Sequence, residues 1–180
     1  MTNKIIALDV DGVVADLLTN WLRWYNRDYN DDLKYTEIVR WETWEFTKPE
    51  CGTKILEYLK NPRLYDDVLP MPGALDAIAK LRMNGYRVIY ATVTPIETTG
   101  VKYAWLERYN LIEHMKDYIE VTDKGLIRAS VLVDDRAENL SHFIGAKILF
   151  DQPWNRQDMS NKTHYAHGWQ EVVDIIQSKV

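Results

Sequence analysis

The chain has 180 residues, of which 46% are hydrophobic and 27% are charged. This length fits one domain, or one domain that carries a subdomain, and the composition is ordinary for a globular protein with a sizeable core. The formal net charge is -5, and no lysine- or arginine-rich stripe stands out in the sequence. Since nucleic-acid polymers are bound through many neutralised phosphates, we expect no such partner, whereas a single small anion bound by a metal ion is compatible with this charge.

Cysteine content and hydropathy indicate the compartment. Cys51 is the single cysteine of the sequence, so an intrachain disulfide framework is excluded. Residues 1–4 lead straight into the first predicted strand, which leaves no room for a signal peptide, and no apolar stretch approaches the roughly 18 residues that span a bilayer. We therefore expect a cytoplasmic protein without a membrane partner.

The first predicted element is a short buried strand at Ile5–Leu8, followed directly by Asp9 and Asp11. Side chains alternate along a strand, so these two carboxylates point to the same side until Gly12 lets the chain turn. Two carboxylates held this close repel each other unless a positive charge lies between them. Mg²⁺, a hard cation that prefers oxygen ligands, is the expected partner, although an Asp-Gly turn at a strand end is by itself common.

A helical insertion is predicted over residues 17–69. This stretch is rich in tryptophan, tyrosine and charge, and its apolar residues recur at helical spacing from Leu17 to Tyr25 and from Ile55 to Leu59. No convincing strand is found in it. Asp16 stands where it can cap the first helix.

From Pro70 onwards, strand and helix patterns alternate. We predict a helix opened by Pro72-Gly73 and running through Leu81, a strand at Tyr86–Thr92, a helix from about Thr99 to Tyr109, a strand near Tyr118–Val121, a strand at Val131–Val133, a helix at Ala137–Ile144, a strand at Lys147–Phe150, a loop at residues 151–162 and a final amphipathic helix containing Trp169 and Ile176. Such alternation indicates an α/β fold with a parallel sheet between two layers of helices. We expect the core to comprise residues 1–16 and 70–180, and a small helical cap to comprise residues 17–69.

Polar side chains follow every early strand of this predicted sheet. Ligands of parallel sheets bind at the carboxyl ends of the strands. That edge should gather five carboxylates, two threonines and a lysine: Asp9, Asp11, Thr92, Thr94, Asp123, Lys124, Asp134 and Asp135. Phosphoryl transfer needs such parts, because an aspartate can attack phosphorus, a second carboxyl can move the proton, and a metal and other donors can neutralise the phosphate. Asp9 and Asp11 suit the two carboxyl roles.

In chain order, Asp9-Val-Asp11, Thr92, Lys124 and Asp134-Asp135 resemble the four motifs of haloacid dehalogenase (HAD) phosphatases. A narrower resemblance covers most of the chain. It is to the 5'(3')-deoxyribonucleotidase family, and it is carried by residues 9–16, 69–74, 102–107, 122–124 and 131–136. This resemblance implies a HAD-like, Rossmann-like three-layer core and Mg²⁺-dependent removal of phosphate from deoxynucleoside monophosphates.

The same resemblance implies the roles of individual residues. Asp9 would be the nucleophile and Asp11 the acid/base, with Mg²⁺ held by Asp9, the backbone carbonyl of Asp11, and Asp134. Lys124 would contact the phosphate and steady Asp9, and Thr92 would hold a phosphate oxygen. The second motif reads Thr92-Val93-Thr94-Pro95 rather than the compact form of many relatives, so Thr92 and Thr94 both stay open, with Thr92 favoured because it ends the strand.

Base recognition is the least defined part of the predicted site. Some relatives place an aromatic residue at the position that Leu17 takes here. Trp41 and Trp44 lie in a less regular stretch of the insertion and are our candidates for substrate contact, since aromatic rings stack on bases. The alternative is that they form the core of the small subdomain.

Two other functions share much of this pattern. One is a phosphatase for another small phosphomonoester, such as a sugar phosphate. The other is a receiver-like signalling module that stays phosphorylated, which Asp11 and the large insertion argue against. The sequence leaves the oligomeric state open, with a homodimer among the options.

Overall fold

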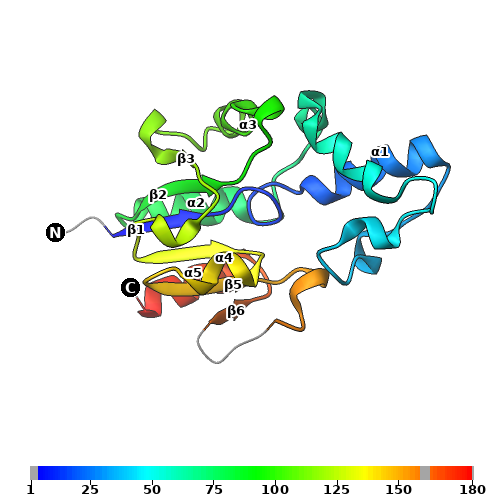
Figure 1. Cartoon of the computed structure of the whole chain (residues 1–180). Helices are drawn as coiled ribbons and strands as arrows, with labels where there is room; N and C mark the ends of the chain where they lie inside the picture. Colours follow the sequence, from blue (N-terminus) through cyan, green and yellow to red (C-terminus); the bar gives the residue numbers. More distant parts are fainter. Residues whose placement is uncertain (1–3, 159–162, 180) are drawn as a thin grey trace.

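The computed structural model describes residues 4–158 and 163–179. Within them, six strands form one parallel sheet in the order β3-β2-β1-β4-β5-β6 (Figure 1). The strand bounds are β1 (Ile5–Leu8), β2 (Arg87–Thr92), β3 (Tyr118–Glu120), β4 (Val131–Asp134), β5 (Ala146–Phe150) and β6 (His164–Ala166). This arrangement confirms the predicted α/β fold with a parallel sheet.

The central strands are apolar on both faces because helices cover both faces of the sheet. Side chains on one face of β1 and β4, such as Ile6 and Val131, pack in the larger core, whereas Ala7 and Leu132 pack in the smaller core on the other face. The register pairs Ile6 with Val131 and Leu8 with Val133. Neighbouring strands therefore end side by side at one edge of the sheet.

The helices form two layers around the sheet (Figure 1). The larger core contains buried side chains of α2 (Ala74–Met83), α3 (Val101–Arg108) and α5 (Trp169–Lys179). The smaller core contains Leu140 of α4 (Ala137–Ser141) and Ile127, which follows the 3₁₀ helix Lys124–Leu126. The remaining 3₁₀ helices of the described residues are Tyr35–Glu37, Thr43–Phe46, Gly52–Lys60, Pro62–Tyr65, Ile96–Thr98, Met115–Asp117 and Pro153–Asn155.

The segment between β1 and α2 projects beyond the carboxyl edge of the sheet (Figure 1). It begins with α1 (Leu17–Tyr29), whose first turn is capped by the Asp16 carboxylate, 3.3 Å from the Thr19 amide nitrogen. After α1 come only 3₁₀ helices and turns, all of them described, so this segment is helical as predicted. The Trp21 indole donates to the Ile55 carbonyl at 2.8 Å and ties α1 to the 3₁₀ helix Gly52–Lys60.

Strand β6 was not predicted from the sequence. This strand has three residues, His164 to Ala166, and pairs at the edge of the sheet with β5. So short a segment carries no measurable alternation of apolar and polar residues, and it pairs because β5 presents an open edge. Residues 159–162 of the predicted loop at 151–162 lie outside the described residues, and Pro153–Asn155 within it forms a 3₁₀ helix.

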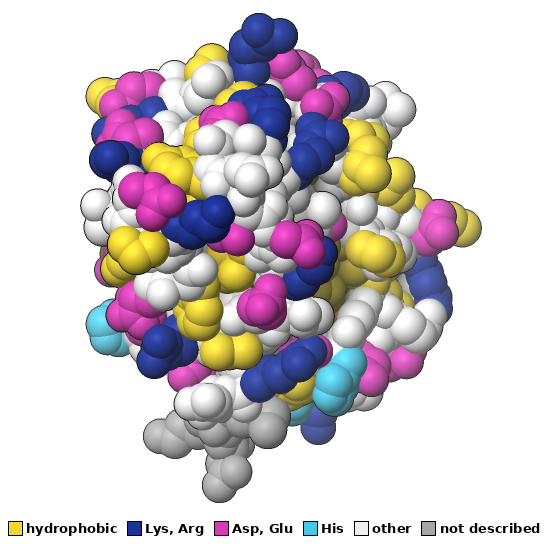
Figure 2. Space-filling model, turned by 90° about the vertical axis from the view of Figure 1, so that its right-hand side faces the viewer, with side chains coloured by type: hydrophobic (Ala, Val, Ile, Leu, Met, Phe, Trp, Pro, Cys, Tyr) yellow, Lys and Arg dark blue, Asp and Glu magenta, His cyan; other side chains and the backbone are white. Residues whose placement is uncertain are grey.

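No helix within the described ranges is both long and apolar enough to cross a membrane. The face that carries the segment 17–69 shows basic side chains scattered among acidic ones (Figure 2). No continuous basic stripe is visible on this face, in agreement with the composition.

The larger core should account for much of the stability of the fold. Ile78 on α2 is fully buried, whereas Leu75 on the same helix is 39% exposed. We expect Ile78→Ala to lower the free energy of unfolding by about 2 to 5 kcal/mol, because it removes buried methyl groups and leaves a cavity. Leu75→Ala should cost less than about 1 kcal/mol. Urea denaturation measures both, and equal costs would contradict this assignment of the core.

Candidate active site

The loop after β1 folds tightly over the carboxyl edge of the sheet. Gly12 has φ +74°, and its amide donates to the Ala15 carbonyl at 2.9 Å. A Cβ atom at this position would lie 2.5 Å from Oδ2 of Asp135. Glycine is therefore required here both for its left-handed backbone and for the close approach of the β4 end.

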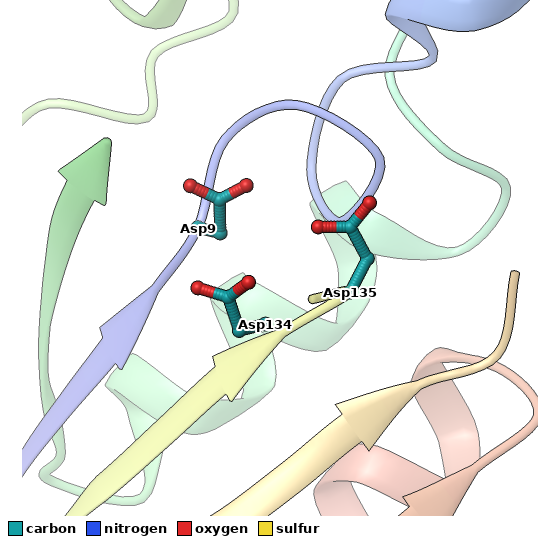
Figure 3. A group of neighbouring side chains, drawn as sticks. All are labelled: Asp9, Asp134 and Asp135. Carbon is teal, nitrogen blue, oxygen red and sulfur yellow. The ribbon is translucent and has the colours of Figure 1, made fainter. Parts of the chain in front are cut away.

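Three buried carboxylates gather at this edge (Figure 3). Asp9 follows β1, Asp134 ends β4, and Asp135 is the next residue. One ligand atom from each lies within 4.8 Å of the others, and the residues are 7%, 0% and 3% exposed. Asp9 and Asp134 meet because β1 and β4 are paired, with the Asp9 amide donating to the Val133 carbonyl at 2.9 Å.

Lys124 is the buried counter-charge of this cluster. Its Nζ lies 2.5 Å from Oδ1 of Asp9 and 2.6 Å from Oδ2 of Asp134. Burial alone would lower the pKa of Lys124, but the two carboxylates outweigh burial and raise the pKa above its ordinary value. Lys124 therefore stays charged.

The pKa values of Asp134 and Asp135 are raised although Lys124 lies beside the cluster. Burial raises the pKa of Asp134 to about 6 despite the contacts with Lys124 and Asn139. Burial and the charges of Asp9 and Asp134 raise the pKa of Asp135 well above its usual range. A cluster of three carboxylates and one ammonium still favours a further cation, and oxygen ligands suit a hard divalent ion.

Asp11 has partners outside this cluster. Its Oδ2 is 2.7 Å from Nζ of Lys102, and its Oδ1 accepts a hydrogen bond from the Tyr65 hydroxyl. Asp11 lines a cavity, and its side chain is 29% exposed. Burial raises the pKa of Asp11, and Lys102 opposes this effect.

Both candidate threonines line the same cavity. The Thr92 hydroxyl accepts a hydrogen bond from Nζ of Lys102 at 2.9 Å and is buried. The Thr94 hydroxyl lies near the phenol of Tyr118 but meets hydrogen-bond geometry with no partner among the described residues. Thr94 is thus the less engaged donor of the two.

The cavity has a volume of about 500 Å³ and extends from the carboxylates to the segment 17–69. Trp41 and Trp44 both line it, as does Leu17. Trp41 is 43% exposed, its ring is 6.4 Å from that of Trp154, and the Arg136 guanidinium lies 4.5 Å from the Trp41 ring centre. Aromatic and aliphatic side chains thus form much of the cavity wall.

Four residues of the site were not singled out from the sequence: Tyr65, Lys102, Asn139 and Trp154. Asn139 donates to Oδ1 of Asp134 at 3.0 Å, and the Trp154 indole donates to Oδ2 of Asp135 at 3.1 Å. Tyr65, Asn139 and Trp154 lie in helices or 3₁₀ helices that carry no recognisable sequence motif. Lys102 falls within the stretch 102–107 that carried the family resemblance, which was the one signal available for it.

The carboxylate cluster predicts a pH-dependent response to metal. The pKa of Asp134 is raised from 3.8, its ordinary value, to about 6 in the fold. The metal-free fold therefore loses stability as the pH rises from about 3.8 to above 6, because the carboxyl group must then lose its proton while buried. A bound cation restores this stability above pH 6. We expect Mg²⁺ at roughly 100 times its Kd to raise the Tm by about 5 to 10 °C near neutral pH, and by less near pH 5. Thermal melts with and without Mg²⁺ measure this. Equal shifts at the two pH values, or a full shift in Asp134→Asn, would contradict the assignment.

Comparison with known proteins bears on what this site does. The family described as 5' nucleotidase, deoxy (pyrimidine), cytosolic type C protein matches residues 3–180. A 5'(3')-deoxyribonucleotidase of Clostridium acetobutylicum is 30% identical over 179 residues, which cover 99% of this chain and 97% of that protein. A 5'(3')-deoxyribonucleotidase of Bacillus subtilis is 29% identical over 171 residues, 94% of this chain and 96% of that one.

Solved structures support the fold. A haloacid dehalogenase-like hydrolase from Streptococcus pneumoniae aligns with a TM-score of 0.66 at 14% identity, covering 98% of this chain and 100% of that one. A HAD hydrolase from Bacillus subtilis bound to magnesium aligns with a TM-score of 0.62 at 12% identity, with coverage of 98% and 100%. The HAD-like fold is thereby confirmed. Because the family match extends over residues 3–180, the chain belongs to the 5' nucleotidase, deoxy (pyrimidine), cytosolic type C (NT5C) family.

Proposed function

We propose that this protein is a Mg²⁺-dependent 5'(3')-deoxyribonucleotidase that works through an aspartyl-phosphate. The observation that carries the proposal is that the carboxylates of Asp9 and Asp11 line one cavity but have different partners. Asp9 belongs to the buried cluster with Lys124, whereas Asp11 has different partners, Lys102 and Tyr65. Two carboxyl groups in different environments suit two different roles.

Asp9 takes the role of nucleophile. Its carboxylate oxygen attacks phosphorus, the bond from Asp9 to phosphorus forms, and the bond from phosphorus to the nucleoside oxygen breaks. Lys124 keeps Asp9 oriented and contributes positive charge beside the phosphate. Mg²⁺, held by Asp9, Asp134 and the Asp11 backbone carbonyl with Asp135 nearby, would neutralise phosphate charge when bound.

Asp11 takes the role of acid and then base. Its carboxyl proton goes to the departing nucleoside oxygen. Water then attacks phosphorus and gives its proton to the Asp11 carboxylate, the bond from Asp9 to phosphorus breaks, and free phosphate and both starting carboxyl groups result. The raised pKa of Asp11 favours the protonated form that the first step needs.

Hydroxyl donors at the end of β2 complete the phosphate site. We assign Thr92 to a phosphate oxygen, and the unengaged Thr94 hydroxyl beside it is a second donor. In this arrangement the phosphate lies between Lys124 and the end of β2.

The cavity walls favour a nucleoside over a sugar. We propose residues 1–16 and 70–180 as the catalytic core and residues 17–69 as a cap, with Trp41 and Trp44 facing the base. A sugar phosphate would bring hydroxyl groups against an aromatic surface and leave them without partners. A cavity of about 500 Å³ fits a single nucleotide rather than a polymer. We place the reaction in the cytoplasm.

Replacing the nucleophile tests the mechanism. We expect Asp9→Asn to lower Mg²⁺-dependent phosphate release from deoxynucleoside monophosphates by at least about 1,000-fold, because the amide cannot attack phosphorus. Asp174→Asn, an exposed change on α5, is the control and should keep full activity. Retained activity in Asp9→Asn would rule out the aspartyl-phosphate.

A substrate panel tests the specificity. Deoxynucleoside monophosphates should turn over with a higher kcat/KM than ribonucleotides, sugar phosphates or an aryl phosphate. If a sugar phosphate is far better than every nucleotide, the enzyme is a phosphatase of another class. A stable acyl-phosphate with slow turnover on all substrates would instead indicate a signalling module.

Truncating the cap tryptophans tests the contact with the base. Stacking is worth about 1 to 3 kcal/mol, so Trp41→Ala and Trp44→Ala should each raise the KM for nucleotides by about 5- to 150-fold while the KM for a small aryl phosphate changes little. Trp24 packs against Tyr58 and does not line the cavity, so Trp24→Leu is the matched control. A nucleotide KM unchanged in both cavity variants would show that these rings only pack within the cap.

A further inference from the structure

Lys102 is a second buried lysine at the carboxyl edge, and the mechanism above does not use it. It lies on α3 and is 3% exposed. Its Nζ is 2.7 Å from Oδ2 of Asp11 and 2.9 Å from the Thr92 hydroxyl, and it also donates to the Val93 carbonyl. A lysine ammonium has three protons to donate, and these three acceptors take all of them.

This count separates Lys102 from Lys124. Among the described residues, Lys124 donates to two acceptors, the carboxylates of Asp9 and Asp134. One of its protons is left for a phosphate oxygen. Lys102 has none left, so it fits a role in holding other side chains rather than in binding phosphate.

The second oxygen of Asp11 is held from the other side. The Tyr65 hydroxyl donates to Oδ1, and residues of α3 contact Tyr65. Arg108 donates to the Tyr65 and Asp66 carbonyls at 2.9 Å each, and the Trp105 ring meets the Tyr65 ring edge to face with centres 6.3 Å apart. One helix therefore sets the partners of both Asp11 oxygens.

We propose that Lys102, together with Tyr65, is a positioning residue that fixes the Asp11 carboxyl group for proton transfer. The inference rests on the proposed function and adds to it how the acid/base is oriented. Rotation of the Asp11 carboxyl would break the contact with Lys102 or that with Tyr65, so its free oxygen lone pairs keep one direction. Small misplacements of a reacting group cost large factors in rate.

Lys102→Met tests this through the leaving group. A nucleoside oxygen needs a proton from Asp11 to depart, whereas p-nitrophenolate departs as a stable anion without one. We expect kcat for deoxynucleotides to fall by about 100-fold, within the range that general acid–base catalysis supplies. With p-nitrophenyl phosphate we expect a fast burst of p-nitrophenolate equal to the enzyme concentration, followed by slow turnover, because hydrolysis of the aspartyl-phosphate still needs Asp11 as base.

Three further variants make the result specific. Lys124→Met should abolish the burst, because it disturbs Asp9 directly. Lys80→Met, an exposed change on α2, should leave every rate unchanged. Tyr65→Phe keeps the ring against Trp105 and removes only the hydroxyl. A smaller loss of nucleotide kcat in this variant, with an unchanged burst rate, supports the proposal even if Lys102→Met folds poorly.

Three outcomes would overturn the inference. The first is an unchanged nucleotide kcat in both Lys102→Met and Tyr65→Phe. The second is a burst rate that falls as much as the nucleotide kcat in Lys102→Met. The third is a large rise in the inhibition constant of inorganic phosphate in Lys102→Met, which would make Lys102 a phosphate ligand. Failure of the proposed function looks different, since the wild-type enzyme would then release no phosphate from nucleotides, or Asp9→Asn would keep its burst.

Discussion

The site depends on the contact of Lys124 with Asp9 and Asp134. The parallel pairing of β1 and β4 brings two carboxylates together where both are buried, and their repulsion would otherwise oppose the fold. Lys124 reaches them from the side of the smaller core because side chains alternate along the strands, so Asp9 shares a face with Ala7 and Asp134 with Leu132. The 3₁₀ helix Lys124–Leu126 packs against α4 on that same side of the sheet.

Lys102 pairs with Asp11 from the opposite side of the sheet. Lys102 comes from α3, whose Trp105 and Leu106 belong to the larger core. Thr92 at the end of β2 alternates to that side, together with Tyr90, and so meets Lys102. The two faces of the sheet thus supply one ammonium each. Asp9 and Asp11, which are only two residues apart, are therefore paired with different lysines.

The sequence predicted the parts of this site that follow strands. Asp9, Thr92, Lys124 and Asp134 each stand next to a recognisable strand or turn, and parallel pairing then brings them to one edge. Tyr65, Asn139 and Trp154 belong to helices and loops whose approach to the edge depends on packing, which no local pattern encodes. The edge strand β6 was missed because three residues show no alternation, and the 3₁₀ character of residues 35–65 because it has no distinct sequence period.

The central claim is that Asp9 carries the phosphoryl group. The most direct measurement is acid quenching of the wild-type enzyme during turnover of a deoxynucleoside monophosphate with Mg²⁺, followed by mass spectrometry of its peptides. The account predicts the added mass of one phosphoryl group on Asp9, lost on treatment with hydroxylamine as expected for an acyl-phosphate. A phosphoryl group on any other residue, or an unmodified enzyme under conditions of continued turnover, would contradict it.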